Sequence, residues 1–324
     1  MALLEIEDLA VAFGPAANAT MVVESVGFTV DAHETVALVG ESGSGKSVTA
    51  LAVMRLLQEP GRVARGAIRF EGRDLARLSE REMAAIRGNR IAMIFQEPMS
   101  SLNPLLSIGA HVAEPLRLHR GLSKRDARTR AIALLDRVGI PSAARRYDDY
   151  PHRMSGGMRQ RVMIAAALAC DPALLIADEP TTALDVTIQA QITDLLADLQ
   201  AEFGMGVLFI THDLGVVAEQ AHRVVVMYAG RVVERAETTK LFGAAAHPYS
   251  AALLRCMPSD DESAGDRLAV IEGSVPTPAT SLGGCRFEPR CPQAITACRA
   301  QEPPLLSLAP GHAAACLKPL AVAR

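Results

Sequence analysis

Short apolar runs recur along the 324-residue chain, and each of them ends at polar or glycine-rich residues. Runs of four or five mainly apolar residues lie at 36–39, 91–95, 174–177 and 207–211. Their length is that of buried strands, because helices need about ten residues or more. Segments with apolar residues at helical spacing separate them. The pattern predicts an α/β fold in which buried strands alternate with helices.

The remaining regions can be assigned by the same criteria. Alternation within residues 3–30 predicts strands around a polar loop, and residues 67–70 predict a further strand. Residues from about 105 to 170 have mainly helical spacing, and another helix is predicted from 186 to Gly204. Residues 224–228 and 231–234 predict a hairpin-like pair. The stretch 258–284 is rich in Asp, Ser, Gly, Thr and Pro, which predicts a linker or an irregular segment.

The stretch 35–57 carries the most specific motif in the chain. A strand run leads into G-E-S-G-S-G-K-S at 40–47, and a helix-compatible run follows with apolar Val48, Leu51, Met54 and Leu57. Small residues let successive backbone N–H groups curl around a phosphate, and the helix adds the positive end of its dipole. An ordinary βα turn is the alternative, but every fixed position of G-x-x-x-x-G-K-[ST] is filled and both flanks fit.

Each residue of this loop has a chemical role in a phosphate site. Backbone N–H groups would come from the small residues, which are Gly40, Ser42, Gly43, Ser44 and Gly45. Lys46 supplies a point charge for the β- and γ-phosphates, and the Ser47 hydroxyl supplies a ligand for Mg²⁺. The loop therefore predicts a site for a nucleotide triphosphate and Mg²⁺.

Polar residues follow three of the predicted strands. Asp178 and Glu179 end the run at 174–177, Gln96 ends the run at 91–95, and His212 follows Thr211. Two adjacent carboxylates at a strand end are costly unless they are used. Asp178 fits a Mg²⁺ ligand and Glu179 a base for water. Gln96 could reach Mg²⁺ or the attacking water, although such a Gln is usually structural. A lone His is usually a surface or core residue, but ligands of open α/β sheets gather at strand ends.

A second potential anion site lies at Ser155-Gly156-Gly157. Ser155 is a good N-cap, and the two glycines leave the N–H groups of the first helical turn bare. A routine capped helix explains the same residues, so both interpretations stay open on the pattern alone. An aromatic at Phe13 could stack on an adenine, but on the pattern alone packing within a strand is the better explanation.

Composition excludes several classes of protein. The chain is 49% hydrophobic and 21% charged, as in globular proteins, and its net charge of −3 gives no general attraction to nucleic acid or anionic lipid. It has no Trp, and its apolar runs are much shorter than the ~20 residues that span a bilayer. The N-terminus has no basic region or cleavage site typical of a signal peptide. We therefore expect a cytosolic protein, with attachment to a membrane partner left open.

Four of the six cysteines lie near the C-terminus, at Cys285, Cys291, Cys298 and Cys316. In a reducing compartment such a cluster indicates a metal site more often than disulfides. Four thiolates can hold a [4Fe–4S] cluster or Zn²⁺, and spacings wider than the C-x₂-C pairs of zinc ribbons favour the cluster. His312 is a possible substitute ligand. Reduced cysteines packed in a small Pro-rich lobe are the structural alternative.

Six motifs, which occur along the chain in the family's order, together resemble those of the ATP-binding subunit of an ABC transporter, over about residues 1–255. The loop at 40–47 looks like the Walker A motif, Leu174–Asp178 with Glu179 like the Walker B motif and its catalytic glutamate, and Ser155-Gly156-Gly157 like the ABC signature. The shorter motifs are similar to the Q-loop glutamine (Gln96), the D-loop (Ala183-Leu184-Asp185) and the switch histidine (His212). The resemblance also makes Phe13 the expected adenine-stacking aromatic.

Other stretches resemble the dipeptide/oligopeptide importer subgroup of this family. They are Q-E-P-M-S-S-L-N-P from Gln96, S-G-G-M-R-Q-R from Ser155, H-P-Y from His247 and G-C-R-F-E-P-R-C-P from Gly284. The signature usually has Gln where Met158 stands. Because the phosphate contacts come from Ser155 and the glycine N–H groups, we expect the site to work. Nickel and glutathione importers share these features, so they remain alternatives for the transported solute.

The resemblance implies a fold and domain boundaries. We expect an α/β fold with a P-loop NTPase core of the ABC ATPase type, an antiparallel β subdomain, and a helical subdomain at about 104–170. An ABC ATPase domain is expected at 1–257. A peptide-importer-type C-terminal region with a small Cys-rich lobe is expected at 258–324.

The resemblance also implies a mechanism and partners. In the family two ATPase subunits close head to tail, so Ser155 and Gly157 would act on ATP bound mainly by the other subunit. The expected partners are a second, related ATPase subunit, two transmembrane permease subunits and an extracytoplasmic substrate-binding protein, with no nucleic acid. The expected location is the cytoplasmic face of the inner membrane. A soluble ABC ATPase of translation or DNA repair is the alternative from another class, but it would normally show two cassettes or a long coiled-coil insertion.

Overall fold

The computed structural model describes residues 2–15, 18–96, 101–181, 185–257, 270–276 and 283–321. The chain forms two compact units. The first unit comprises residues 1–3, 30–34 and 77–210, and the second comprises residues 4–29, 35–76 and 211–324. Both units combine helices with strands, as the apolar pattern predicts.

Three parallel strands form the buried centre of the first unit. β6 (Ile91–Ile94) pairs with β7 (Leu174–Asp178), and β7 pairs with β8 (Gly206–Thr211). Every residue of β7 and β8 is buried. Strands covered on both faces have no polar alternation, which is why these segments appear in the sequence as continuous apolar runs. The strands predicted here are confirmed.

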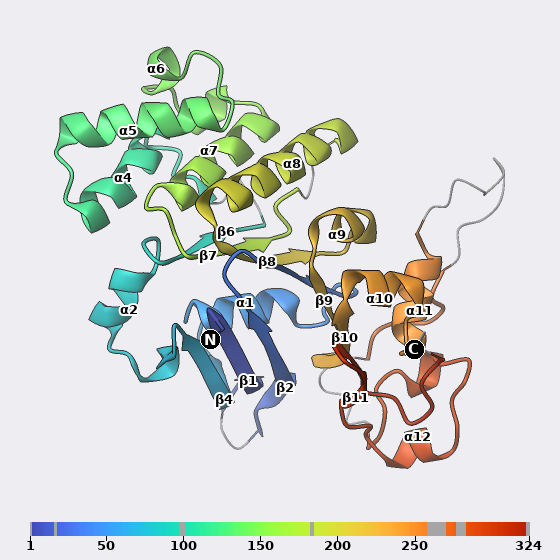
Figure 1. Ribbon diagram of the computed structural model, residues 1–324. Helices are drawn as coiled ribbons and strands as arrows, with labels where there is room; N and C mark the ends of the chain where they lie inside the picture. The colour runs from blue at the N-terminus through green and yellow to red at the C-terminus, as the bar shows by residue number, and fades with distance from the viewer. Residues whose placement is uncertain are drawn as a thin grey trace. The chain divides into compact units, whose positions relative to one another are not determined.

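Helices make up most of the remainder of the first unit. They are α2 (Glu80–Ile86), α4 (Ile108–Arg120), α5 (Lys124–Arg137), α6 (Ala143–Arg146), η3 (Pro151–Arg153), α7 (Gly156–Leu168) and α8 (Val186–Phe203). Figure 1 shows α4, α5, α6 and α7 gathered into one helical group. Gly109 allows this packing, because a Cβ there would lie 2.2 Å from the Tyr147 ring. The predicted helical region is confirmed.

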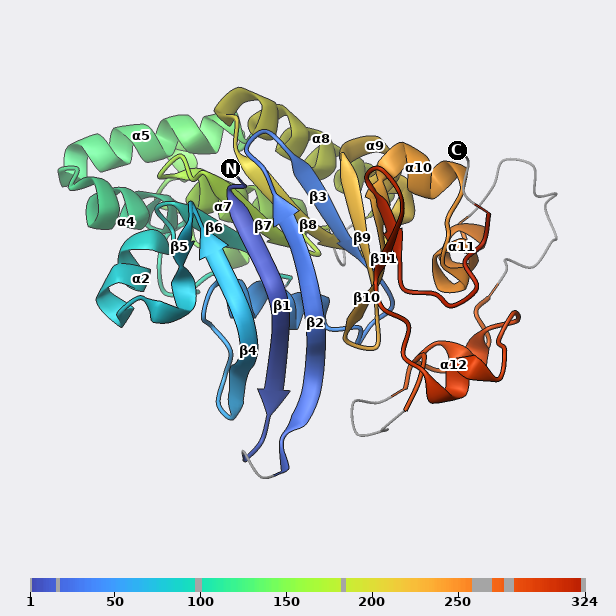
Figure 2. The ribbon, with the colours of Figure 1, turned by 60° about the horizontal axis from the view of Figure 1, so that its bottom comes forward.

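An antiparallel sheet opens the second unit, with strand order β2-β1-β4-β5. The strands are β1 (Leu4–Phe13), β2 (Thr20–Val30), β4 (Gly61–Phe70) and β5 (Arg73–Asp74), followed by η2 (Leu75–Arg77). Figure 2 shows β1, β2 and β4 side by side. Gly66 lies at the irregular part of the β1–β4 pairing, and a Cβ there would lie 2.5 Å from the carbonyl oxygen of Asp8. The expected antiparallel β subdomain is confirmed.

A second set of strands in this unit includes the strand before the glycine-rich loop. β3 (Thr35–Val39) runs parallel to β9 (Arg223–Tyr228), and β9 forms the predicted hairpin with β10 (Arg231–Glu237). Beyond β10 come β12 (His312–Ala314) and β11 (Leu306–Ala309), which the sequence did not predict. Helices α9 (Leu214–Gln220), α10 (Thr238–Gly243) and α11 (Pro248–Arg255) complete the region, and its core includes Tyr228, Tyr249 and Phe287.

One helix prediction was wrong in its details. α1 (Lys46–Val53) begins at the end of the glycine-rich loop as predicted, but it buries Thr49, Ala50, Ala52 and Val53. Its predicted apolar stripe through Val48 and Leu51 is only partly buried, and Leu57 lies beyond the helix. The packed face therefore combines small residues with Val53 and Met54, and only Met54 of the predicted stripe is buried.

The C-terminal segment (residues 283–321) contains η4 (Glu288–Arg290), α12 (Ala297–Ala300), β11 and β12. Through β12 it extends the strands of the second unit. Most of the predicted linker at 258–284 lies outside the described residues, as do Ala183 and Leu184 of the D-loop resemblance. The prediction of a lobe built around four cysteines stays a prediction.

Candidate functional site

The glycine-rich loop connects β3 to α1 in a backbone form that only glycine adopts easily. Gly40, Gly43 and Gly45 have φ values of 150°, 78° and 99°. A Cβ on Gly40 would lie 2.1 Å from the carbonyl oxygen of Met227 in β9. Around Gly43, by contrast, a Cβ would have nothing within 4 Å. The loop is thus held tightly where it leaves β3 and is open at its tip.

Polar groups of this loop fit an anion. Lys46 is 5% exposed, and its ammonium group donates to the carbonyl oxygens of Gly40 (2.7 Å) and Glu41 (3.1 Å). Ser44 Oγ is buried and has no hydrogen-bond partner among the described residues. Gly45 is the N-cap of α1, and no side chain in the described parts of the chain caps the N–H groups there. A bound phosphate would satisfy these donors.

Three residues far along the chain also fix the loop, and sequence reasoning missed all of them. The Gly230 N–H donates to the Ser44 carbonyl oxygen (2.9 Å), and the Glu41 N–H donates to Tyr249 Oη (2.9 Å). The Arg290 guanidinium binds both oxygens of the Glu41 carboxylate, at 2.7 and 3.0 Å. The Ala229-Gly230 turn and the H-P-Y stretch can be recognised in the sequence, but no sequence pattern indicates that they contact the loop.

Two other predicted site residues belong to the second unit. Phe13 is the last residue of β1 and is partly exposed, and its ring faces Gly61, where a Cβ would come within 2.6 Å of it. His212 is exposed and directly follows β8. Adenine stacking by Phe13 and phosphate sensing by His212 stay predictions.

The predicted carboxylates and glutamine belong to the first unit. Asp178 is the buried last residue of β7, at 4% exposure, and Glu179 follows it with a φ of 46°. The Glu179 N–H donates to the Ile210 carbonyl oxygen (2.9 Å), which fixes its backbone beside β8. Gln96 Nε2 donates to Glu179 Oε2 at 2.9 Å. The structure thus brings Gln96 and Glu179 together at the carboxyl ends of β6 and β7, where α/β sheets bind ligands.

The second predicted anion site lies at the N-terminus of α7. Ser155 is its N-cap and accepts a hydrogen bond from the Met158 N–H (3.3 Å). Gly157 allows close packing of α7 on α8, because a Cβ there would lie 2.8 Å from Ile188 Cγ2. Asp185 caps α8 by accepting from the Ile188 N–H (2.9 Å). A hollow of about 400 Å³ is lined by Ser155, Gly156, Gly157, Met158, Arg161, Asp185 and Ile188.

The four C-terminal cysteines line one small cavity of about 10 Å³, and all are free thiols. Burial raises the pKa of Cys285 to about 11 and also raises the pKa values of Cys291 and Cys316. Across the residues that the structure describes, no group of three or more His, Cys, Asp or Glu side chains is placed to hold a metal ion. The predicted iron–sulfur or zinc centre is therefore not confirmed.

His312 does not join these cysteines as a substitute ligand. Its Nε2 atom lies 2.6 Å from an oxygen of Glu234, and both side chains are buried. The same carboxylate accepts the N–H groups of Ala246 (2.7 Å) and His247 (2.8 Å) at the start of α11. His312 thus belongs to a buried polar junction between β10, β12 and α11.

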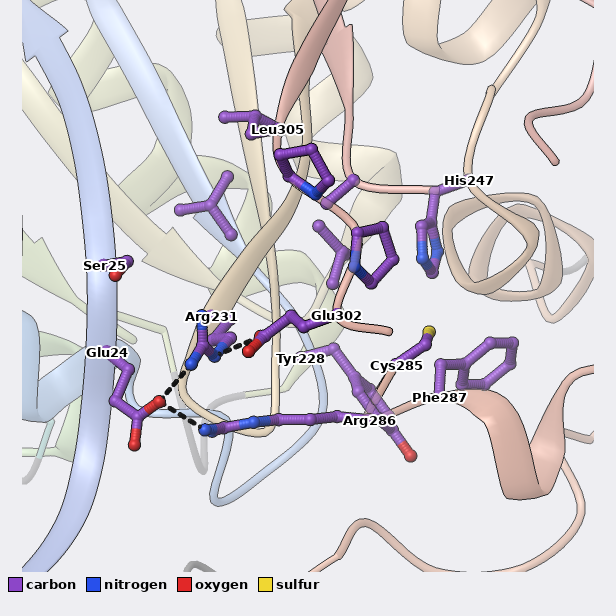
Figure 3. Close-up of a pocket in the computed structure, with 15 residues that line it drawn as sticks. Glu24, Ser25, Tyr228, Arg231, His247, Cys285, Arg286, Phe287, Glu302 and Leu305 are labelled. Carbon is purple, nitrogen blue, oxygen red and sulfur yellow. Dashed lines mark hydrogen bonds and ion pairs between the residues drawn. The ribbon is translucent and has the colours of Figure 1, made fainter. Parts of the chain in front are cut away.

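A larger cavity of about 360 Å³ lies beside the C-terminal segment (Figure 3). On one wall Glu24 of β2 pairs with both Arg231 and Arg286 (2.6 Å to Arg286), and Arg231 pairs with Glu302 (2.6 Å). Each of these four charged side chains has an opposite partner. Burial lowers the pKa of Arg286. The network ties the C-terminal segment to β2 and β10.

Comparison with known proteins decides the family. The family model described as ABC transporter matches residues 23–182, and the model described as oligopeptide/dipeptide transporter, C-terminal region, matches residues 233–298. A dipeptide transport ATP-binding protein, DppD of Escherichia coli (strain K12), is 51% identical over 320 residues, which cover 99% of this chain and 98% of that protein. The chain belongs to the ABC transporter ATP-binding proteins.

Solved structures agree with this membership. An ATP-binding cassette determined as a dimer in a post-hydrolysis state, bound to ADP and Pi, has a TM-score of 0.65 and 29% identity. It covers 72% of this chain, and 98% of that cassette is matched. A cassette of Clostridium perfringens, part of the ABC transporter complex cbiONQ, has a TM-score of 0.63 and 26% identity, covering 75% of this chain and 91% of its own. The predicted ABC ATPase fold is confirmed.

Among the described helices of this ABC protein, none combines the length and apolar character that crossing a membrane requires.

Proposed function

We propose that this chain is the ATP-hydrolysing subunit that powers peptide import by an ABC transporter. The observation that carries the proposal is the match of residues 233–298 to the oligopeptide/dipeptide transporter C-terminal region. The name of the Escherichia coli relative, a dipeptide transport ATP-binding protein, supports the same substrate class. The reaction is ATP + H₂O → ADP + phosphate, coupled to movement of the solute. We assign the ABC ATPase domain to 1–257 and the importer-type C-terminal region to 258–324.

The residues of the second unit would bind the nucleotide. N–H groups from Gly40 to Ser47 surround the phosphates, with the orphaned Ser44 hydroxyl as a further donor. Lys46 would exchange its two loop carbonyls for the β- and γ-phosphates, and Ser47 would ligate Mg²⁺. Phe13 stacks on the adenine. When bound at Ser47 and Asp178, Mg²⁺ would supply positive charge to balance the charge that develops on the phosphate oxygens.

The residues of the first unit would supply the hydrolytic groups. Asp178 supports Mg²⁺, and Glu179 orients and polarises the attacking water as a base. The hydrogen bond from Gln96 holds the Glu179 carboxylate in one orientation and keeps one of its oxygens occupied. Gln96 would also reach Mg²⁺ when nucleotide is bound, and His212, which belongs to the second unit, would sense the γ-phosphate. A carboxylate positioned in this way typically contributes about 10²–10⁴-fold in rate.

The second anion site supports one of the proposed partners, a second ATPase subunit. We assign the hollow of about 400 Å³ at Ser155, Gly156, Gly157 and Asp185 to ATP held mainly by a second, related ATPase subunit. Two helix N-termini then enclose the phosphates, so binding closes the dimer and hydrolysis opens it. Two transmembrane permeases and an extracytoplasmic binding protein complete the complex, with this subunit at the cytoplasmic face of the membrane.

Import of nickel or glutathione is the second candidate function, because those importers resemble the same subgroup. ATP hydrolysis by the assembled complex distinguishes these solutes. When this subunit is purified with its permeases and the second ATPase, the complex should hydrolyse ATP faster if its binding protein carries a di- or oligopeptide. Stimulation only by nickel- or glutathione-loaded binding protein would reject peptides as the solute. Failure to co-purify with any membrane subunit would support a soluble ABC ATPase instead.

We further propose that the four cysteines hold a metal centre, a [4Fe–4S] cluster in preference to Zn²⁺. Their convergence on one cavity supports the proposal, together with spacings wider than those of zinc ribbons. The raised pKa values keep the thiols neutral without a cation, and a bound metal would deprotonate them. The cavity is about the size of one water molecule, so a cluster requires the side chains to move apart.

Anaerobic purification tests the metal centre. Brown protein with visible charge-transfer absorbance, and about four irons per chain, is expected for a [4Fe–4S] cluster. Cys298→Ser should lose the colour, whereas Cys256→Ser, outside the cavity, should keep it. Colourless protein with one Zn²⁺ per chain would reject the cluster, and metal-free protein would reject both.

A further inference from the structure

The first residue after Gly40 is held by the C-terminal part of the chain. Glu41 makes one backbone and one side-chain contact there: its N–H donates to Tyr249 Oη, and its carboxylate is bound by Arg290. Tyr249 follows Glu41 by 208 positions and Arg290 follows it by 249. These two contacts fix both the backbone of Glu41 and the position of its carboxylate, in a loop whose tip is open.

Arg290 is itself rigidly held. Its side chain is 5% exposed, and its Nε and Nη2 atoms donate to the carbonyl oxygens of Glu272 (2.8 Å) and Ile271 (2.9 Å). Nη1 also contacts Tyr228 Oη at 3.3 Å. Arginine offers a planar fork that binds both oxygens of a carboxylate, which lysine cannot do. Arg290 is thus fixed by its own contacts and can hold the Glu41 carboxylate in place.

The surrounding rings make Tyr249 an equally fixed support. Its ring centroid lies 4.6 Å from that of Tyr228 and 5.3 Å from that of Phe287. Phe287 and Arg290 lie between Cys285 and Cys291 in the chain, so the cysteine-bearing turn packs on the same rings. The phosphate loop and the C-terminal segment therefore share one continuous set of contacts.

We propose that Arg290, supported by Tyr249, is a positioning residue for nucleotide binding: it holds the Glu41 end of the loop and neutralises the Glu41 carboxylate. A free carboxylate on this loop would repel the phosphates of ATP. Because Arg290 neutralises the Glu41 carboxylate, the C-terminal segment influences the affinity of the loop for nucleotide. This inference rests on the nucleotide site proposed above, and it adds a contribution from outside that site's motif.

The test compares Kd for MgATP across full-length variants. Arg290→Gln leaves the Glu41 charge uncompensated and should raise Kd about tenfold. The double variant Glu41→Gln/Arg290→Gln removes that charge and should bring Kd back to within about twofold of wild type. Arg290→Lys should be intermediate, because it keeps the charge but loses the bidentate geometry. If Arg290 acted only by holding the loop and not by neutralising the Glu41 carboxylate, the double variant would bind MgATP as weakly as the single variant or more weakly, which would contradict the proposal.

Controls separate binding from folding. Tyr249→Phe keeps the ring packing and loses only the acceptor for the Glu41 N–H, so it should raise Kd about threefold without lowering Tm by more than a few degrees. Arg299→Gln breaks an exposed pair with Glu288 in the same segment and should leave Kd unchanged. Equal Kd values for wild type, Arg290→Gln and Tyr249→Phe would overturn the proposal. A wild-type chain that bound no ATP would instead overturn the nucleotide site.

Discussion

Glu179 shows how much one residue can be constrained by the backbone around it. Its φ of 46° lies in the left-handed region, which a residue with a Cβ adopts only when its surroundings hold it there. The hydrogen bond from the Glu179 N–H to the Ile210 carbonyl oxygen holds this backbone, and the bond from Gln96 orients the side-chain carboxylate. Strain at the end of a central strand is typical of residues that must present a side chain in one direction. The geometry therefore agrees with a base for water.

Glu179→Gln should preserve ATP binding and lower steady-state hydrolysis by at least about 100-fold, because the amide keeps the shape but cannot accept a proton. Nucleotide titration and phosphate release on the assembled complex measure the two effects. Glu202→Gln is a matched control, since Glu202 only pairs with Arg137 at the surface. Turnover at the wild-type rate in the Glu179→Gln variant would mean that another group activates the water.

Among the elements, α11 begins at an unusual N-cap. His247 Nδ1 accepts the Tyr249 N–H at 3.0 Å, so this nitrogen must be unprotonated. The ring is 1% exposed and lies 5.9 Å from Phe287, with the Glu234 carboxylate bound to the backbone N–H of His247. Burial lowers the pKa of His247 from 6.5 to about 4. Protonation would remove the cap and place a buried charge at the positive end of the helix.

Stability should therefore fall in mild acid. The unfolded chain takes up the proton near pH 6.5 and the folded chain only near pH 4, so acid favours unfolding. The contribution of the neutral ring is complete above pH 6.5 and is lost as the pH falls toward 4, by about 3 kcal/mol. His247→Asn keeps a capping acceptor that does not titrate. Denaturant unfolding should show a shallower loss of stability between pH 6.5 and 4 for this variant than for wild type.

Exposed His152 provides the control for that experiment, because His152→Asn should leave the loss of stability between pH 6.5 and 4 as it is in wild type. The idea is wrong if His247→Asn and wild type lose stability equally over this pH range. The variant will have a lower Tm at neutral pH in any case, since Asn leaves part of the space beside Phe287 empty. Only the change in unfolding stability with pH therefore tests the role of His247.

Elements with local signals were predictable from the sequence, and long-range partners were not. The loop at 40–47 and the Ser155 cap are specified by neighbouring residues, so glycine spacing and N-cap chemistry found them. Glu234, in contrast, is fully buried in β10 because Ala246, His247 and His312 bind its carboxylate. Arg290 reaches Glu41 across 249 positions. Such pairs depend on how the elements pack, and no spacing rule within one segment encodes them.

At the scale of the whole molecule, the two anion sites differ in what they contain. The phosphate loop has a buried lysine, the hydroxyl of Ser47 and an anchored backbone, which are the groups that the proposed ATP site requires within one chain. The hollow at Ser155 offers a capped helix start and two glycines, with Arg161 as its basic side chain. The hollow therefore suits a phosphate that is bound mainly by residues outside it. The proposed function therefore assigns the two sites to a functional unit larger than this chain.

Ser155→Arg tests that conclusion most directly. An arginine would occupy the hollow of about 400 Å³, so the assembled complex should lose at least about tenfold in ATP hydrolysis. The isolated chain should bind MgATP as tightly as wild type, because its own nucleotide rests on the phosphate loop. Ser123→Arg changes the N-cap of α5 in the same way, at a similar stability cost of about 1 kcal/mol, and should leave hydrolysis intact. If Ser155→Arg weakened ATP binding by the isolated chain, the signature serine would act on the chain's own nucleotide, and the head-to-tail arrangement would be wrong.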